Sequence, residues 1–169
     1  VVNIGPFTTM NTTRGVILGG RKGNPSTRLY NHIEYVTIQT TGNTTDFGDL
    51  YLAAVAAANA GSICNATRGF AVGGYDYPAS PYTSFNTIQY ITTATLGNSQ
   101  DWGDLLNPRT GAALCSSPTR GVVACGSNPS LTTSIECFEL TTLGNAVDFG
   151  DATQARRTVG GASNGHGGL

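Results

Sequence analysis

The sequence predicts an all-β fold assembled from repeated four-stranded units. Only 11% of the 169 residues are charged, 23 are Gly, and Thr, Ser and Asn fill much of the rest. β-Branched residues suit a pleated surface, and Gly and Asn suit the tight turns between strands. A stretch of the form Gly-Asn-x-x-Asp-Phe/Trp-Gly-Asp also occurs three times, at residues 42–49, 97–104 and 144–151. Such self-similarity at a regular period is typical of arrays of one supersecondary unit.

The period of this repeat is near 50 residues. The Asp before the aromatic residue recurs at Asp46, Asp101 and Asp148, which are 55 and 47 residues apart. A Thr-Arg-Gly stretch recurs at similar spacing, centred on Arg14, Arg68 and Arg120. We treat residues 1–169 as one domain and divide it into unit 1 (1–52), unit 2 (53–105), unit 3 (106–152) and the opening of a fourth unit (153–169).

Each complete unit is expected to contain four short strands. The expected ranges are 4–10, 15–20, 32–38 and 46–50 in unit 1; 58–64, 69–74, 87–92 and 101–105 in unit 2; and 110–115, 121–126, 134–140 and 147–151 in unit 3. The Gly-Asn pair predicts a turn before the last strand, because both residues tolerate left-handed backbone. The aromatic residue that follows (Phe47, Trp102 or Phe149) is predicted to be a buried wedge.

Charge and hydropathy exclude several classes of partner. The formal net charge is −1, which gives no electrostatic reason to expect nucleic acid or an anionic membrane surface. No apolar run approaches the roughly 18 residues of a spanning helix, so we expect no membrane insertion. The four cysteines form no C-x-x-C pair and are too few for a disulfide framework, which argues against zinc and leaves their redox state open.

The units resemble kelch repeats. The resemblance rests on an apolar strand that ends in Gly-Gly, a Tyr in the following strand, the aromatic residue at the start of the last strand and an Arg that opens the next unit. These are Gly19-Gly20 and Gly73-Gly74; Tyr35 and Tyr90; Phe47, Trp102 and Phe149; and Arg109 and Arg156 or Arg157. Three positions depart from the pattern: Cys125 replaces the first Gly, Cys137 the Tyr and Ala54 the Arg.

More closely, the units resemble the degenerate kelch-like arrays of tail-fibre and appendage proteins of bacteriophages, notably cyanophages. The resemblance implies that each unit is one four-stranded blade of a β-propeller. Propellers close with about 4–8 blades. We therefore expect three blades and the start of a fourth to be part of a larger propeller; the alternatives are that two chains close one ring and that the units stack without closure.

The resemblance also implies a non-catalytic structural and receptor-binding module of a virion appendage, located on the virion or outside the cell. Its partners would be a host-surface glycan or protein and other appendage subunits. The loops at 21–30, 75–85 and 127–133 would face the host. Two alternatives remain open: a carbohydrate-active enzyme on a propeller scaffold, and a kelch scaffold for protein interaction.

Two sets of residues are candidates for binding. The loop after residue 74 carries aromatic rings that suit stacking on sugars, although they would equally pack on one another: Tyr75, Tyr77 and Tyr82. The Thr-Arg-Gly cations would line one mouth of a propeller and hold an acidic glycan, or would stack on aromatic rings of a neighbouring blade or pair with a loop Asp. These are Arg14, Arg68 and Arg120.

Catalysis, metal binding and cofactors have little support in the sequence. Asp46 and Asp49 have the spacing of two possible calcium ligands, but we favour a structural role in which the carboxylates accept hydrogen bonds from loop amides. His32 and His166 have no motif partner, and no nucleophile-elbow, zinc-protease or phosphate-loop motif is present. We predict no catalytic residue, no metal and no cofactor.

Overall fold

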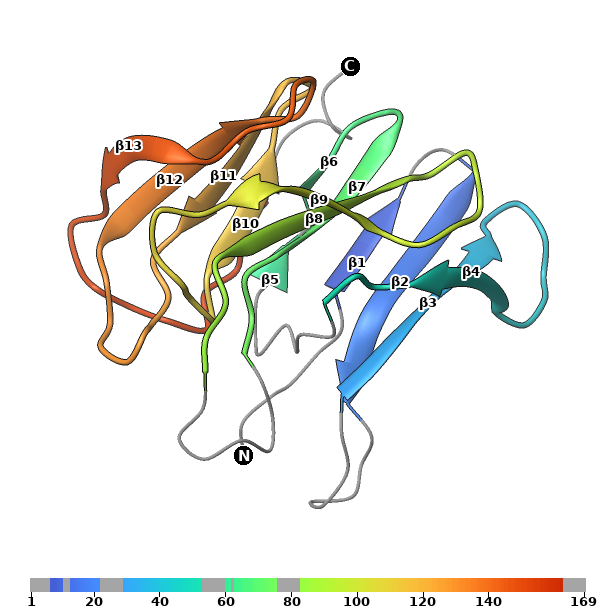
Figure 1. The fold of residues 1–169 in the computed structure, drawn as a ribbon, viewed down its shortest axis with the longest axis horizontal. Coiled ribbons are helices and arrows are strands. Elements are labelled where there is room, and N and C mark those ends of the chain that lie inside the picture. Colours follow the sequence, from blue (N-terminus) through green and yellow to red (C-terminus); the bar gives the residue numbers. More distant parts are fainter. Residues whose placement is uncertain are drawn as a thin grey trace.

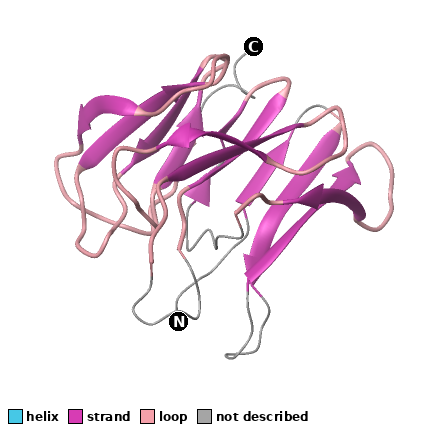
Figure 2. Cartoon of the chain, viewed as in Figure 1, coloured by secondary structure: helices cyan, strands magenta, loops and turns pink. Residues whose placement is uncertain are grey.

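The described part of the chain consists of strands, turns and irregular segments. In the computed structural model these are residues 7–10, 13–21, 29–52, 60–61, 63–75 and 83–162. Within them there is no helix (Figure 2), and hence none with the length and hydrophobicity that crossing a membrane requires. The prediction of an all-β fold is confirmed.

Each unit contributes one sheet in which strands that follow one another in the chain pair in antiparallel fashion. Unit 1 has the order β1-β2-β3-β4, with β1 (Phe7–Met10), β2 (Arg14–Arg21), β3 (Leu29–Thr37) and β4 (Thr45–Asp49). Unit 2 has the order β6-β7-β8-β9, with β6 (Ile63–Cys64), β7 (Arg68–Val72), β8 (Thr87–Thr92) and β9 (Gln100–Asp104). Unit 3 has β10 (Ala113–Ser116), β11 (Arg120–Ala124), β12 (Ser134–Glu139) and β13 (Val147–Asp151).

The three sheets lie side by side in chain order, from the blue sheet of unit 1 through the green sheet to the orange sheet of unit 3 (Figure 1). This arrangement is propeller-like. The strands also agree closely with expectation, since β8 and β13 coincide with the predicted ranges 87–92 and 147–151. All three units share one irregularity, a shift of register between the third and fourth strands, which raises the local twist. It falls at Ile33/Glu34, Ile88/Gln89 and Ile135/Glu136.

One predicted strand is wrong. The range 58–64 was expected to be a single strand of unit 2, but it contains two short strands that belong to different sheets. β6 pairs with β7, whereas β5 (Ala60–Gly61) pairs in parallel with β10 at the edge of the unit 3 sheet. A run of small residues gives no hydrophobic alternation from which such a change of partner could be predicted.

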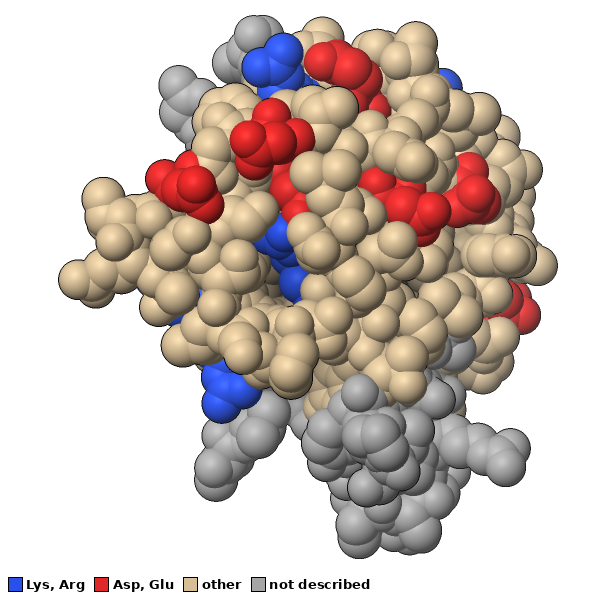
Figure 3. Space-filling model, turned by 60° about the vertical axis from the view of Figure 1, so that its left-hand side comes forward, with Lys and Arg blue, Asp and Glu red and all other residues tan. Residues whose placement is uncertain are grey.

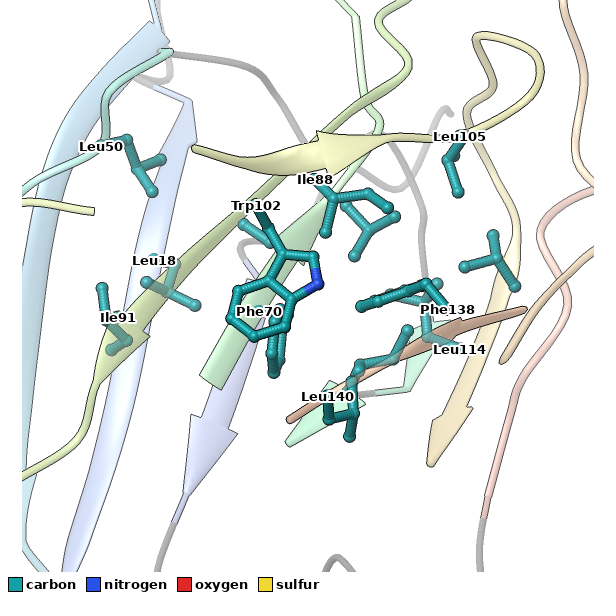
Figure 4. Packing of buried hydrophobic residues seen from close by; sticks show 14 of the residues in the cluster. Leu18, Leu50, Phe70, Ile88, Ile91, Trp102, Leu105, Leu114, Phe138 and Leu140 are labelled. Atoms are coloured by element: carbon teal, nitrogen blue, oxygen red, sulfur yellow. The ribbon is translucent and has the colours of Figure 1, made fainter. Parts of the chain in front are cut away.

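The hydrophobic core runs through all three units. Figure 4 shows its centre, where Trp102 stands over Phe70 and faces Phe138 and Leu140. The ring of Phe70 lies 5.0 Å from that of Trp102 and 5.5 Å from that of Phe138, both edge to face. Because Phe138 belongs to unit 3 and the other two rings to unit 2, aromatic packing joins neighbouring sheets.

The prediction of a buried aromatic wedge is correct for two units and wrong for the third. The exposed fraction is 3% for Phe47 and 3% for Trp102, but 54% for Phe149. Units 2 and 3 cover the first two residues, whereas no described residue covers Phe149 in the same way.

Candidate functional site

The repeated Gly-Asn turns lie where one unit meets the next, and we call each such contact a joint. At the joint between units 1 and 2, the amide of Gly97 donates to Phe47 O (2.8 Å) and that of Ser99 to Asp49 O (2.9 Å). The amide of Asp49 in turn donates to Asn98 Oδ1 (3.0 Å). The turn of one unit therefore satisfies the exposed edge of the preceding unit's last strand, which is one way to protect a sheet edge.

The joint between units 2 and 3 repeats these bonds atom for atom. Gly144 N donates to Trp102 O (3.1 Å) and Ala146 N to Asp104 O (2.8 Å), while Asp104 N donates to Asn145 Oδ1 (3.0 Å). A further bond runs from Trp102 Nε1 to a carbonyl of unit 3, that of Glu139 (3.1 Å).

The Gly of the Phe/Trp-Gly-Asp stretch is required by the same contact. A Cβ at Gly48 would lie 2.5 Å from the backbone of Gly97, and one at Gly103 would lie 2.5 Å from Gly144 O. Both glycines have positive φ, +147° and +149°. A side chain here would separate two units.

Two of the candidate arginines are also part of the joints. Arg14 lies 4.9 Å from the ring centre of Tyr35 and donates to Thr93 O of unit 2 (2.7 Å). Arg68 lies 5.1 Å from the ring centre of Trp102 and donates to the carbonyl of Leu140 in unit 3 (3.1 Å). Each cation stacks on an aromatic ring of its own unit, not of the neighbouring one as expected, and bonds forward to the next unit.

Arg120, the third candidate, is different. It is exposed, and its Nε lies 3.6 Å from Glu139 Oε1, a half-exposed surface pair that contributes little stability. Of the three cations, it is the one that makes no described bond to another unit. Whether the three act together as an anion-binding ring stays a prediction.

The Asp-x-x-Asp carboxylates accept fewer hydrogen bonds from loop amides than expected. The side chains that accept amide protons at the joints are those of Asn98 and Asn145. Asp49 instead lies 3.3 Å from His32 Nδ1, and Asp151 accepts a hydrogen bond from the Thr133 hydroxyl (2.8 Å). Within the described residues no group of three or more His, Cys, Asp or Glu is placed to hold a metal ion. Figure 3, with the unit 3 side brought forward, shows acidic side chains spread over that side, not gathered together.

Sequence reasoning missed the one buried ion pair of the described chain, Arg109 with Glu136. Arg109 lies among the first residues of unit 3, before β10, and is 2% exposed; Glu136, on β12 of the same unit, is fully buried. The guanidinium donates to Glu136 Oε1, to Ser134 O (3.0 Å) and to Cys125 O (3.2 Å). Burial lowers the pKa of Arg109, and the Glu136 carboxylate opposes that shift.

The equivalent position of unit 2 holds a neutral residue. Gln89 is also buried; its amide nitrogen donates to Leu52 O (2.9 Å), and its Oε1 accepts from the Ser99 hydroxyl (2.8 Å). In the sequence, unit 2 has Ala54 where the Arg would stand. Unit 2 therefore lacks both the Arg and the carboxylate that unit 3 has, and this paired difference between the two units is the sequence signal that would have revealed the ion pair.

The tyrosine loop is only partly described. Tyr75 is 9% exposed and forms a β-bridge with Ser84 at the neck of the loop, where Phe85 N donates to Gly74 O (2.8 Å). A ring so deeply buried has little face left for a sugar. Tyr77 and Tyr82 lie outside the described residues.

An open groove of about 520 Å³ lies on unit 3, beside the exposed ring of Phe149. Cys115, Arg120 and Val122 also line it. Burial raises the pKa of the Cys115 thiol, so the group is protonated and a weak nucleophile at neutral pH. Within the described residues all four cysteines are free thiols.

No protein-family model matches the chain, and neither does any curated protein. Among solved structures of similar fold is one described as the structure of YjhT. The similarity has a TM-score of 0.70 at 10% sequence identity, and it covers 89% of this chain and 52% of that chain. The chain thus spans about half the length of that structure. The likeness supports a β-rich, propeller-like fold.

Proposed function

We propose that the chain is a non-catalytic structural and binding module built of kelch-like propeller blades, one blade per unit. In this proposal it belongs to a surface appendage such as a phage tail fibre and presents loops to a glycan or protein of the host. The observation that carries the proposal is the use of the repeated polar residues. Asn98, Asn145, Arg14 and Arg68 all bond one unit to the next, as expected of a scaffold.

The placement of the loops supports a binding role. In each unit the second strand ends and the third strand begins on the same side of the array, the lower side of Figure 1. In the sequence, the ranges 21–30, 75–85 and 127–133 join those strand ends. Variation in length and composition among them, above a constant scaffold, is how repeat proteins commonly present a binding face.

Glycan-array binding by the purified chain tests this proposal. We expect the double variant Tyr77→Ala/Tyr82→Ala to lose at least about tenfold in affinity, because it removes two stacking rings and a tenfold loss requires only about 1.4 kcal/mol. Its melting temperature should be unchanged. Tyr51→Ala is the matched control, since this tyrosine is 69% exposed and lies in another segment. Unchanged binding by the double variant, or glycan turnover that depends on one Asp or Glu, would contradict the proposal.

A further inference from the structure

A joint needs the edge of one unit's last strand and the Gly-Asn turn of the next unit. Unit 3 offers the strand edge at one end of the array, and unit 1 offers the turn at the other. On unit 3, the atoms equivalent to Phe47 O and to the amide and carbonyl of Asp49 are Phe149 O and the backbone of Asp151. In the part of the chain that the structure describes, no residue of another unit bonds to them. The exposed ring of Phe149 and the groove beside it stand where a following unit would pack.

Unit 1 carries the opposite half. Gly42, Asn43 and Thr44 occupy the positions of Gly144, Asn145 and Ala146, the turn that caps β9. All three residues of the first turn are exposed, whereas Ala146 is buried. Among the described residues none makes a hydrogen bond to this turn.

The arginine that bonds to the next unit gives a second match between the two ends of the array. Arg68 donates to Leu140 O, and the residue at the same position of unit 1 is Ile38. The equivalence follows from the turns, because Leu140 N donates to Thr119 O (2.7 Å) and Ile38 N to Thr13 O (2.9 Å). Ile38 is 53% exposed. The carbonyl of Ile38 is therefore placed to accept a hydrogen bond from Arg120 of a preceding unit, as the carbonyl of Leu140 accepts one from Arg68.

A charge pair gives the third match. The backbone carbonyl of Arg156 accepts from Gly126 N (2.8 Å), as that of Arg109 accepts from Gly74 N (3.0 Å), so Arg156 holds the position of Arg109 after unit 3. Glu34 holds the position of Glu136 in unit 1, because each lies directly after the register shift. Both Arg156 and Glu34 are exposed. One end therefore offers the cation and the other the carboxylate of the buried pair.

We infer that these halves bind each other between two copies of the chain, head to tail, so that two chains close one ring. The Gly42–Thr44 turn of each copy would cap β13 of the other, and Arg156 would meet Glu34 at each of two identical joints. Head-to-tail contacts form closed rings when the rotation per subunit permits. Two sets of three units lie within the roughly 4–8 blades of closed propellers. One chain also spans about half of the similar solved structure, so two would span it fully.

Charge reversal at the two ends tests the inference by sedimentation velocity. The wild-type chain should sediment with twice the 17.5 kDa mass of one chain. Glu34→Arg or Arg156→Glu alone should weaken the dimer at least about a hundredfold, since each places like charges together in a desolvated joint. The double variant Glu34→Arg/Arg156→Glu, and an equimolar mixture of the two single variants, should both restore it. Only a head-to-tail joint between these residues predicts that rescue.

Two controls guard against a trivial result. Arg157→Glu makes the same change of charge at the neighbouring exposed residue and should leave the dimer nearly intact. The circular dichroism and melting of each monomeric variant should match an intact fold, because Glu34 and Arg156 are exposed. Alkylation of Cys115, which lines the groove, should be slower in the wild-type dimer than in Glu34→Arg.

A wild-type chain that stays monomeric at high concentration would overturn the inference. The β13 edge and the Gly42–Thr44 turn would then be expected to bind blades other than those of a second copy. A dimer that survives both single reversals would overturn it in favour of another surface. Species larger than a dimer would show that the ring does not close with two chains.

Discussion

Arg109 and Glu136 show how a buried charge is used in this fold. Arg109 bonds to two carbonyls and one carboxylate later in its own unit 3, while Glu136 Oε2 accepts from Leu106 N in the segment that leads from β9 to Arg109 (2.8 Å). The pair thus fastens the connection between units 2 and 3 to the sheet of unit 3. Desolvation offsets much of the attraction in such pairs, and Arg109 Nε is buried without a hydrogen-bond partner among the described residues. The pair therefore fixes where the connecting segment lies on the sheet of unit 3 more than it adds to the free energy of unfolding.

Breaking this pair on one side should be costly. We expect Glu136→Gln to lower the free energy of unfolding by about 3–5 kcal/mol, because the Arg109 charge would stay buried without its counter-charge. The double variant Arg109→Met/Glu136→Gln should be more stable than Glu136→Gln alone, since it resembles the neutral arrangement around Gln89. Urea unfolding of the wild type, Glu136→Gln and the double variant measures both effects. Equal losses in the single and double variants would show that the charge is not what destabilises the protein.

At the scale of the strand and turn, one motif serves three positions of different exposure. Phe-Gly-Asp or Trp-Gly-Asp is covered by the next unit's turn in β4 and β9, but not in β13. The glycines Gly48 and Gly103 contact that turn, whereas within one chain no described atom lies within 4 Å of a Cβ built at Gly150. The same residue is thus required for packing in two units and only for backbone conformation in the third.

Substitution of these glycines should separate the two requirements. Gly103→Ala should cost at least about 3 kcal/mol, since it adds a clash with Gly144 to the strain of positive φ. In the background of Glu34→Arg, which keeps the chain monomeric and β13 uncapped, Gly150→Ala should cost only the strain at φ +137°, about 1–3 kcal/mol. Chemical denaturation of both variants makes the comparison. Similar losses in the two variants would mean that the contact with Gly144 does not exclude a side chain at Gly103.

The elements were largely predictable from the sequence because their signals are local. Gly-Asn turns, β-branched runs and the repeat place β8 and β13 without any tertiary information. Burial at the joints was not predictable in this way, because it depends on whether another unit follows. Phe149 has the same neighbours in sequence as Phe47, yet only Phe47 is covered. The partner of Arg109 was missed for a related reason, since Glu136 lies 27 residues away and meets it only in the fold.

At the scale of the molecule, the units share one core and should not melt independently. The core includes Val16 and Phe47 of unit 1, Phe70 and Trp102 of unit 2, and Leu140 of unit 3. Repeat arrays with strong contacts between neighbours unfold cooperatively, whereas weak contacts allow stepwise unfolding. The hydrogen bonds, cation–aromatic contacts and aromatic packing at each joint favour the cooperative case.

The chain has a single tryptophan, Trp102, which makes this testable. At a fixed protein concentration, its fluorescence and the far-ultraviolet circular dichroism of the whole chain should give coincident unfolding curves. Phe47→Ala, a change in unit 1, should lower the free energy of unfolding by about 3–5 kcal/mol, because it removes a buried ring. The fluorescence curve of Trp102 in unit 2 should shift by the same amount as the circular dichroism curve. A tryptophan transition that stays in place while the circular dichroism shifts would mean that the joint between units 1 and 2 transmits no stability, and that each unit folds on its own.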